Sequence, residues 1–290
     1  MATSTRNCDI RRMSQQDEVT SRSKSSAPFS EKHRDIIREM FGPVSEALIE
    51  DAGVTSGSSV LDVATGPGEP ALRLAEVVGP AGEVVGADPA VGMIEAARRM
   101  ASERSLKNVR FEVAGVDSLP FPDGHFDVVI SRYGVMFFPS PINGIREMLR
   151  VLKPGRTIGL AVWHHLDNNP FHCCLSRIVD RFAPEPDLPP DAPDAFRFAT
   201  PGKLRGIAEE AGARDVSERK FHFSIDAPLT VEEFWNLRCD MSERLRQRLA
   251  ALSTEALTEL KKQALHAFRS YEKGAGVSFP AEVLIVSGRK

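Results

Sequence analysis

Two acidic residues and two glycines stand at a spacing that could hold a nucleotide-containing cofactor. Asp62 follows an apolar run and lies four residues before Gly66, with Gly68 two residues further on. Glycine lets the backbone adopt positive φ or approach a ligand closely, and the free N–H groups that open the next helix then face that ligand. Asp88 ends a second apolar run about 20 residues beyond Gly68, a spacing that suits a carboxylate accepting the hydroxyls of an adenosine ribose.

The glycine loop fits two classes of cofactor, and one acidic residue separates them. The segment from Gly66 to Ala71 also satisfies the G-x-G-x-x-G/A pattern, so a nicotinamide or flavin dinucleotide is an alternative ligand. A carboxylate at Asp62, inside the first strand, would repel the pyrophosphate of a dinucleotide. It suits a ligand with a cationic amino-acid end, and S-adenosylmethionine carries both an ammonium and a sulfonium. The spacing therefore favours a methyl donor, with a dinucleotide oxidoreductase as the weaker alternative.

The elements that position these residues alternate between apolar runs and helical patterns. Strands are expected over 59–64, 83–87, 109–113, 126–131 and 157–163, and helices over 70–78, 90–102 and 141–151. Further strands are expected over 214–226 and 277–287. Repeated strand–helix units imply an α/β fold with a parallel sheet wound on both faces.

Four sequence blocks resemble one family. They are residues 60–71, residues 86–89 with Met93, residues 119–127 and residues 146–155. Residues from about 58 to 163 resemble class I S-adenosylmethionine-dependent methyltransferases, especially the broad ubiquinone/menaquinone-biosynthesis-like group that acts on small molecules. The resemblance implies a Rossmann-like, doubly wound, mostly parallel sheet of seven strands with an antiparallel last strand and a helical cover. It also implies S-adenosyl-L-methionine as the cofactor.

The loop chemistry and the resemblance together indicate which residues bind the cofactor. They are Asp62, Ala64, Gly66, Pro67, Gly68, Asp88, Pro89, Met93, Gly115, Val116, Asp117 and Ser131. By resemblance, Met93 lines the adenine ring. The chain departs from the family pattern at Gly115, which stands where an acid usually meets the adenine amine, so the Gly115 backbone or Asp117 is expected to serve instead. A β-branched side chain at Gly68 is expected to enter the space of the cofactor.

Two residues at strand ends are candidates for catalysis. Tyr133 follows the fourth strand, where the transferable methyl group must emerge, and could orient a substrate or remove a proton; an equally simple interpretation is a structural aromatic residue. This region lacks the Asn/Asp-Pro-Pro-aromatic motif of enzymes that methylate exocyclic amines. His164 follows the fifth strand and is the candidate general base. Its neighbour His165 points to the opposite side in extended backbone, so no metal site is expected.

The chain divides into a disordered tail and one methyltransferase domain. Residues 1–28 are polar and aperiodic and are expected to be disordered. Within 29–290 the expected parts are N-terminal helices (29–57, interrupted at Pro43), a cofactor-binding core (58–169), a loop and helix cover (170–199), a return to the core (200–229), two inserted helices (230–274) and the last strand (275–290). The cover is expected to place aromatic residues nearest the substrate: Phe171, Phe196, Phe198, Phe234 and Trp235.

Composition limits the class of partner. The 290 residues carry a net charge of −3 and no long basic block, which argues against nucleic acid. No apolar run reaches the ~18 residues of a membrane helix, and the N-terminus lacks the apolar core of a secretory signal, so a cytoplasmic protein is expected. The four cysteines show neither metal-ligand nor disulfide spacing.

The expected activity is transfer of a methyl group to an O, N or C nucleophile of a small, hydrophobic or aromatic molecule. Because the sulfonium of the donor is already activated, the protein needs to supply alignment, exclusion of water and, for some acceptors, removal of one proton. The sequence therefore identifies the donor and leaves the acceptor and the oligomeric state open. The alternative from another class is a non-catalytic cofactor-binding partner protein with a methyltransferase-like fold.

Overall fold

The apolar runs around the glycine loop form the centre of a mixed sheet in the computed structural model, which describes residues 33–186, 189 and 191–290. The strands are β1 (Ser59–Val63), β2 (Glu83–Asp88), β3 (Val109–Val113), β4 (Phe126–Arg132), β5 (Leu152–Trp163), β6 (Arg214–Ala227), β7 (Glu272–Lys273) and β8 (Gly276–Arg289). Their order is β3-β2-β1-β4-β5-β8-β6, and the two-residue β7 pairs with β8.

The sheet contains both parallel and antiparallel strand pairs. β1 to β5 are mutually parallel, whereas β8 runs antiparallel to both β5 and β6. The predicted α/β sheet with an antiparallel last strand is therefore confirmed. Leu61 pairs with Val85 on one side and Val129 on the other, and all three are fully buried. Strands buried on both faces read as continuous apolar runs, which is why sequence alone located them.

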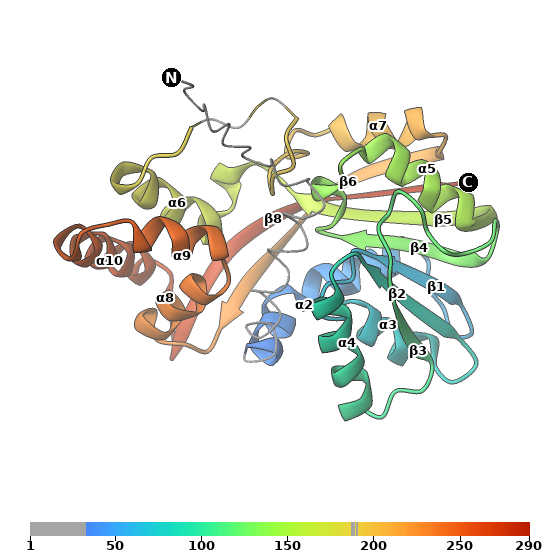
Figure 1. The fold of residues 1–290 in the computed structure, drawn as a ribbon, viewed down its shortest axis with the longest axis horizontal. Helices are drawn as coiled ribbons and strands as arrows, with labels where there is room; N and C mark the ends of the chain where they lie inside the picture. Colours follow the sequence, from blue (N-terminus) through green and yellow to red (C-terminus); the bar gives the residue numbers. More distant parts are fainter. Residues whose placement is uncertain (1–32, 187–188, 190) are drawn as a thin grey trace, which may run out of the picture.

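Five helices flank the sheet. They are α2 (Arg34–Asp51), α3 (Ala71–Val78), α4 (Val91–Glu103), α5 (Pro141–Val151) and α7 (Lys203–Ala211), and a short 3-10 turn η1 (Val135–Phe137) follows β4. In Figure 1, α5 and α7 lie side by side above the sheet, and α2, α3 and α4 lie below it. α7 ends at Gly212, which has the left-handed conformation that glycine adopts readily.

The N-terminal helix differs from its prediction. Two helices separated at Pro43 were expected, but α2 runs unbroken from Arg34 to Asp51 with Pro43 inside it. Proline lacks one backbone N–H and costs about 3 kcal/mol in a helix interior. Met40, Val44 and Leu48 on the same helix are fully buried, so packing against the sheet offsets that cost.

A helical cover lies beyond the C-terminal ends of β4 and β5 (Figure 1). It consists of η2 (Leu166–Asn168), α6 (Pro170–Phe182), α8 (Val231–Asp240), α9 (Glu243–Ala250) and α10 (Thr254–Arg269). A capping box starts α8: the Glu233 N–H donates to Thr230 Oγ1 at 3.3 Å, and the Thr230 N–H donates to Glu233 Oε2 at 2.9 Å. The predicted pair of inserted helices is three helices, because Ser242 caps a new helix by accepting from the Leu245 N–H.

An aromatic cluster joins the cover to the sheet. The Phe234 ring of α8 lies 5.0 Å from Phe268 of α10 and 4.9 Å from Phe279 of β8, centroid to centroid. The Phe171 ring of α6 lies 6.1 Å from that of Phe279. The cover is therefore packed on the last strand by buried rings.

Several sequence predictions fall at the limits of what the structure describes. The predicted disordered tail, residues 1–28, lies outside the described residues. In the proline-rich stretch 184–193, the described residues form no helix or strand. The division of the chain into functional parts stays a prediction. Among the described residues, no helix is long and apolar enough to cross a membrane.

Candidate active site

The loop between β1 and α3 is built on positive φ angles. Ala64, Gly66 and Gly68 have φ of 59°, 57° and 110°. A Cβ added at Gly66 would meet no atom within 4 Å, so this glycine leaves open space at the loop surface. A Cβ added at Gly68 would lie 3.1 Å from Cβ of Ala97 and from Cδ1 of Leu72. An added side chain would therefore enter open space at Gly66 and would meet the core at Gly68. The role of both glycines in cofactor binding stays a prediction.

Asp62 stabilises this loop through hydrogen bonds. Its side chain is 0% exposed, and Oδ2 accepts from Thr65 Oγ1 at 2.6 Å and from the Ala71 N–H at 3.2 Å. The other oxygen, Oδ1, is buried and has no hydrogen-bond partner in the described protein. Burial raises the pKa of Asp62 to about 7, although the Thr65 hydroxyl and the Arg132 guanidinium oppose that rise. The carboxyl group therefore shapes the loop with one oxygen and keeps the other unpaired.

Asp88 ties the loop to the start of α4. Its Oδ2 accepts from the Gly66 N–H at 3.0 Å and its Oδ1 from the Ala90 N–H at 2.9 Å. The side chain is 9% exposed; burial raises the pKa of Asp88, and the two backbone donors oppose the rise. Each carboxylate oxygen can accept a second hydrogen bond. The residue can therefore brace the loop and still accept a ligand hydroxyl.

The remaining cofactor candidates line the rim of the loop. The Ala114 N–H donates to the Asp88 carbonyl, which brings the segment after β3, with Gly115, Val116 and Asp117, beside β2. Gly115 has open space where a Cβ would stand, Val116 is buried and Asp117 is exposed. Pro89 is exposed, and Pro67 and Met93 are partly buried. The structure thus gathers the ends of β1, β2 and β3 at one edge of the sheet.

Tyr133 meets this edge from the end of β4. A Cβ added at the following Gly134 would lie 2.6 Å from Ala64 Cβ and 2.5 Å from Ser131 Oγ, so the end of β4 packs directly on the glycine loop. Tyr133 has a φ of 61°, and its ring stacks on Trp163 with centroids 4.6 Å apart. The hydroxyls of Tyr133 and of the fully buried Ser131 have no hydrogen-bond partner in the described protein. Burial raises the pKa of Tyr133 far above its usual value, so the phenol is neutral near pH 7.

The His164 side chain contacts β8 and not Tyr133. Its side chain is 3% exposed, and Nδ1 lies 2.9 Å from Glu282 Oε2 and 2.7 Å from Asn168 Nδ2. Burial lowers the pKa of His164, and the Glu282 carboxylate opposes that shift. Neighbouring residues of a strand point to opposite faces. Trp163 is therefore the β5 side chain that meets Tyr133, and His164 contacts β8 through Glu282.

Comparison with known proteins assigns the glycine loop and its strands. Residues 60–155 match the family model described as a methyltransferase domain. Over 136 residues the chain is 39% identical to the ubiquinone/menaquinone biosynthesis C-methyltransferase UbiE of Ectopseudomonas mendocina (strain ymp), a stretch covering 47% of this chain and 52% of that protein. The chain carries a class I S-adenosylmethionine-dependent methyltransferase domain. It spans about half the length of the curated relatives it matches.

Solved structures share this fold over most of the chain. The YcgJ protein from Bacillus subtilis matches with a TM-score of 0.55 and 22% identity over 85% of this chain and 97% of its own. Phosphoethanolamine N-methyltransferase 2 of Haemonchus contortus matches with a TM-score of 0.57 and 16% identity over 97% of this chain and 61% of its own. At such identities the likeness shows the fold alone.

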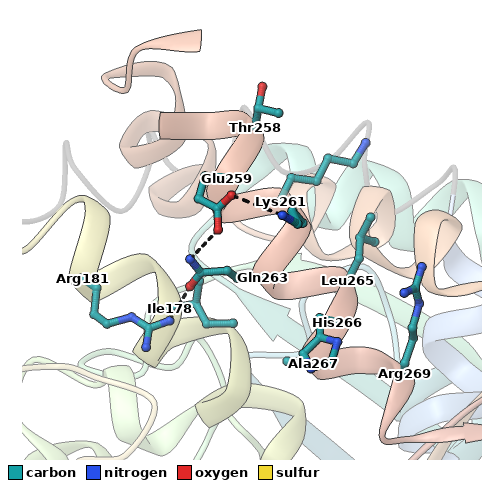
Figure 2. Close-up of a pocket in the computed structure, with 11 residues that line it drawn as sticks. Ile178, Arg181, Thr258, Glu259, Lys261, Gln263, Leu265, His266, Ala267 and Arg269 are labelled. Atoms are coloured by element: carbon teal, nitrogen blue, oxygen red, sulfur yellow. Dashed lines mark hydrogen bonds and ion pairs between the residues drawn. The ribbon is translucent and has the colours of Figure 1, made fainter. Parts of the chain in front are cut away.

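A groove at the cover of the methyltransferase domain is separate from this site. It lies between α6 and α10 and has a volume of about 710 Å³. Figure 2 shows Arg181 of α6 and Gln263 of α10 reaching toward each other, with Glu259 beyond Gln263. None of the residues predicted to bind the cofactor or to act in catalysis lines the groove.

The sequence analysis did not identify Trp163, His172 or Arg238 as residues near the site. Trp163 links Tyr133 to α6, because its ring also meets His172 at 4.6 Å between centroids. Arg238 of α8 lies over the Phe171 ring, with Cζ 3.8 Å from the centroid. Of the five aromatic residues predicted near the substrate, Phe171 and Phe196 contact His172, whereas Phe234 belongs to the cluster that joins cover and sheet.

Proposed function

We propose that this protein transfers a methyl group from S-adenosylmethionine to an O, N or C nucleophile of a small, hydrophobic or aromatic molecule. The proposal extends the assignment of the domain to an activity of this chain. The curated relatives are named as C-methyltransferases of ubiquinone and menaquinone biosynthesis. Their name supports including carbon, beside oxygen and nitrogen, among the possible acceptor atoms. The cytoplasmic location also stays a prediction.

One observation carries the proposal: the glycine loop has open space at Gly66 and an unpaired carboxylate oxygen beneath it. The absence of a Cβ at Gly66 lets a ligand lie on the backbone, and Asp62 Oδ1 is a buried acceptor without a donor. A buried acceptor left unpaired costs about 1–3 kcal/mol. A cationic ligand at the loop would relieve that cost, and S-adenosylmethionine is both cationic and the cofactor of this family.

The proposed cofactor contacts follow from the positions of the strand ends. Asp88 would accept the ribose hydroxyls beside its two backbone donors, and the backbone at Gly115 or the side chain of Asp117 would meet the adenine. Met93 would line the adenine ring. Pro67, Gly68, Pro89, Val116 and Ser131 complete the proposed set, together with Asp62, Ala64 and Gly66.

The cofactor would supply an activated methyl group, and the side chains of this protein would orient the acceptor. Tyr133 is suited to donate a hydrogen bond from its unpaired hydroxyl, because its raised pKa keeps the proton on the phenol. His164 stays the predicted base, because burial keeps its imidazole neutral and Nε2 has no partner in the described protein, but its ring contacts Glu282 of β8 and not Tyr133. Because Nδ1 is engaged by Glu282 and Asn168, a proton would have to be taken up at Nε2.

Calorimetry with S-adenosylmethionine and, separately, with NAD tests the donor. We expect binding of the former alone. A screen of phenols, quinols, amines and carboxylic acids for release of S-adenosylhomocysteine then tests transfer. Binding of S-adenosylmethionine without transfer to any acceptor class would favour a non-catalytic cofactor-binding protein, and binding of NAD alone would refute the assignment of the loop.

A further inference from the structure

Arg238 is a half-buried cation whose guanidinium lies against an aromatic ring. Its guanidinium carbon lies 3.8 Å from the centroid of the Phe171 ring, and its Nε is buried without a hydrogen-bond partner. Among the described residues no carboxylate forms an ion pair with it, and the nearby thiols of Cys174 and Cys239 are neutral near pH 7 because burial raises the pKa of each to about 11. Burial lowers the pKa of Arg238 to about 10, which still leaves it charged near pH 7.

Other arginines of the cover have partners. Arg248 of α9 donates to Asp180 at 2.7 Å, and Arg244 donates to Glu185 at 2.8 Å. Arg181 of α6 donates to Gln263 at 2.6 Å. A charged group with a buried N–H, such as Arg238 Nε, is normally paired, because removing a charge from water costs far more than a cation–π contact returns. The position of Arg238 therefore calls for an anion that the described chain does not supply.

A continuous run of rings connects Arg238 to the candidate active site. Phe171, under the guanidinium, contacts His172 at 4.9 Å, and His172 contacts Trp163 at 4.6 Å, measured between centroids. Trp163 stacks on Tyr133, which packs beside the glycine loop. His172 Nε2 and the Tyr133 hydroxyl are buried without partners, as is Arg238 Nε. α6, α8 and the end of β4 thus each carry a buried, unpaired polar atom on a residue that contacts this run of rings.

The charges around His172 are consistent with an anion site. Burial lowers the pKa of His172 well below its usual value, and the nearby Arg238 cation lowers it further. His172 is therefore neutral and can donate or accept one hydrogen bond at Nε2. The negative charge of the anion would therefore be balanced by the Arg238 guanidinium alone.

We propose that Arg238 binds the carboxylate of the methyl acceptor, and that the acceptor is an aromatic acid whose ring packs along Trp163 and His172. The inference rests on the proposed function and names its substrate class. The planar guanidinium matches a carboxylate bidentately, which favours this anion at a single arginine. The aromatic neighbours favour a ring next to it. The methionine carboxylate of the cofactor is the competing anion and is an outcome of the test.

The test compares aromatic acids with their neutral amides. Benzoate, cinnamate, 1-naphthoate and indole-3-carboxylate are each titrated beside the corresponding primary amide into the full chain loaded with S-adenosylhomocysteine, and Kd is measured by calorimetry. We expect at least one acid to bind roughly tenfold to a hundredfold more tightly than its amide, the range for a charge-assisted hydrogen bond. No preference for any acid over its amide would overturn the proposal without the need for a variant.

Two variants then locate the preference. In Arg238→Gln and Arg238→Met the ratio of acid to amide affinity should fall to about one, while the Kd for S-adenosylmethionine stays unchanged. Arg238→Met keeps an apolar stem over Phe171 and is the variant of choice if Arg238→Gln does not fold. Arg181→Gln is the matched control, because it removes an equal charge from the outer part of the cover and should leave the ratio intact.

Each remaining outcome has a distinct meaning. Survival of the acid preference in both Arg238 variants would overturn the proposal. Loss of S-adenosylmethionine binding in those variants would assign the guanidinium to the cofactor and also overturn it. Acid preference at Arg238 in a protein that never binds S-adenosylmethionine would retain the carboxylate site and refute the proposed function instead.

Discussion

Replacement of the two loop glycines separates cofactor binding from folding. In Gly66→Ala the new methyl group enters open space, so the cost to the fold is the left-handed backbone alone, about 1–2 kcal/mol at a φ of 57°. In Gly68→Ala the φ of 110° lies outside the region that alanine adopts readily. Its Cβ would also press on Ala97 and Leu72 at 3.1 Å, so we expect a larger loss of stability.

For cofactor binding we expect the opposite order: Gly66→Ala should lose more affinity than Gly68→Ala. The methyl group of Gly66→Ala would stand where the cofactor approaches, and overpacking of this kind costs about 1–3 kcal/mol, or roughly five- to 150-fold in Kd. The Gly68→Ala methyl group points into the core, so the folded fraction should keep more of its affinity. Urea denaturation of the protein without cofactor gives the stability change, and calorimetry with S-adenosylmethionine gives Kd.

One result would refute this reasoning. If Gly66→Ala bound S-adenosylmethionine as tightly as the parent protein, and a folded Gly68→Ala did not, the ligand would approach the loop from the side of Gly68. The assignment of the open face to Gly66 would then be wrong. Gly212→Ala is a control for backbone strain alone, because Gly212 also has positive φ and open space but ends α7, outside the predicted cofactor set.

Three further predictions concern the same edge of the sheet. Because the pKa of Asp62 is raised from 3.8 to about 7, the folded state holds its proton more tightly and loses stability as pH rises through that window. The free energy of unfolding of Asp62→Asn relative to the parent should therefore increase from pH 4 to pH 8, by an amount on the order of 2 kcal/mol or more; a flat difference in urea denaturation contradicts a raised pKa. Asp88→Asn can accept only one of the two backbone N–H bonds, so it should lose about 1–3 kcal/mol of stability and also bind S-adenosylmethionine more weakly by calorimetry; unchanged values for both would remove Asp88 from the loop support. Tyr133→Phe should leave stability unchanged or slightly higher, because the hydroxyl is buried without a partner, and should lower kcat on a phenolic acceptor, as should His164→Ala; full activity of both variants on that acceptor would leave alignment alone as the mechanism.

The sheet and the glycine loop could be predicted because their signals are local in sequence. β3 has the predicted bounds, 109–113, and β1, β2 and β4 agree within one residue of theirs. β1, β2 and β4 are short, largely apolar runs buried inside a parallel sheet, whereas β3 at its edge alternates apolar and charged residues. The loop was recognisable because two acids and two glycines of defined spacing determine its geometry.

The errors in the helices arose where tertiary packing opposed a local signal. Pro43 predicted a break in α2, but the buried side chains on either side of it hold one continuous helix. The opposite error occurred at Ser242: two helices were predicted over 230–274, and a serine cap starts a third. Local propensity and packing compete within a few kcal/mol, and sequence alone does not show which prevails.

The acceptor side could not be predicted, because its contacts join residues far apart in the chain. Tyr133 and Trp163 stack across neighbouring strands, and Arg238 reaches Phe171 from another helix. One signal was present in the sequence of α8. Val231, Phe234 and Trp235 form its buried stripe, and Arg238 occupies the next position of that stripe, where a cation is unexpected.

The comparison with relatives covers the residues predicted to bind the methyl donor, but not the residues of the cover that are proposed to bind the acceptor. The matched family model ends at residue 155, so it contains the glycine loop and Tyr133 but neither His172 nor Arg238. The identity of the acceptor therefore has to be argued from the cover of this chain. An aromatic acid anchored by its carboxylate at Arg238 would extend along His172 and Trp163 toward Tyr133, which lies beside the loop. The ring position that receives the methyl group would then be remote from the carboxylate, and the neutral phenol of Tyr133 would hydrogen-bond a substituent at that end.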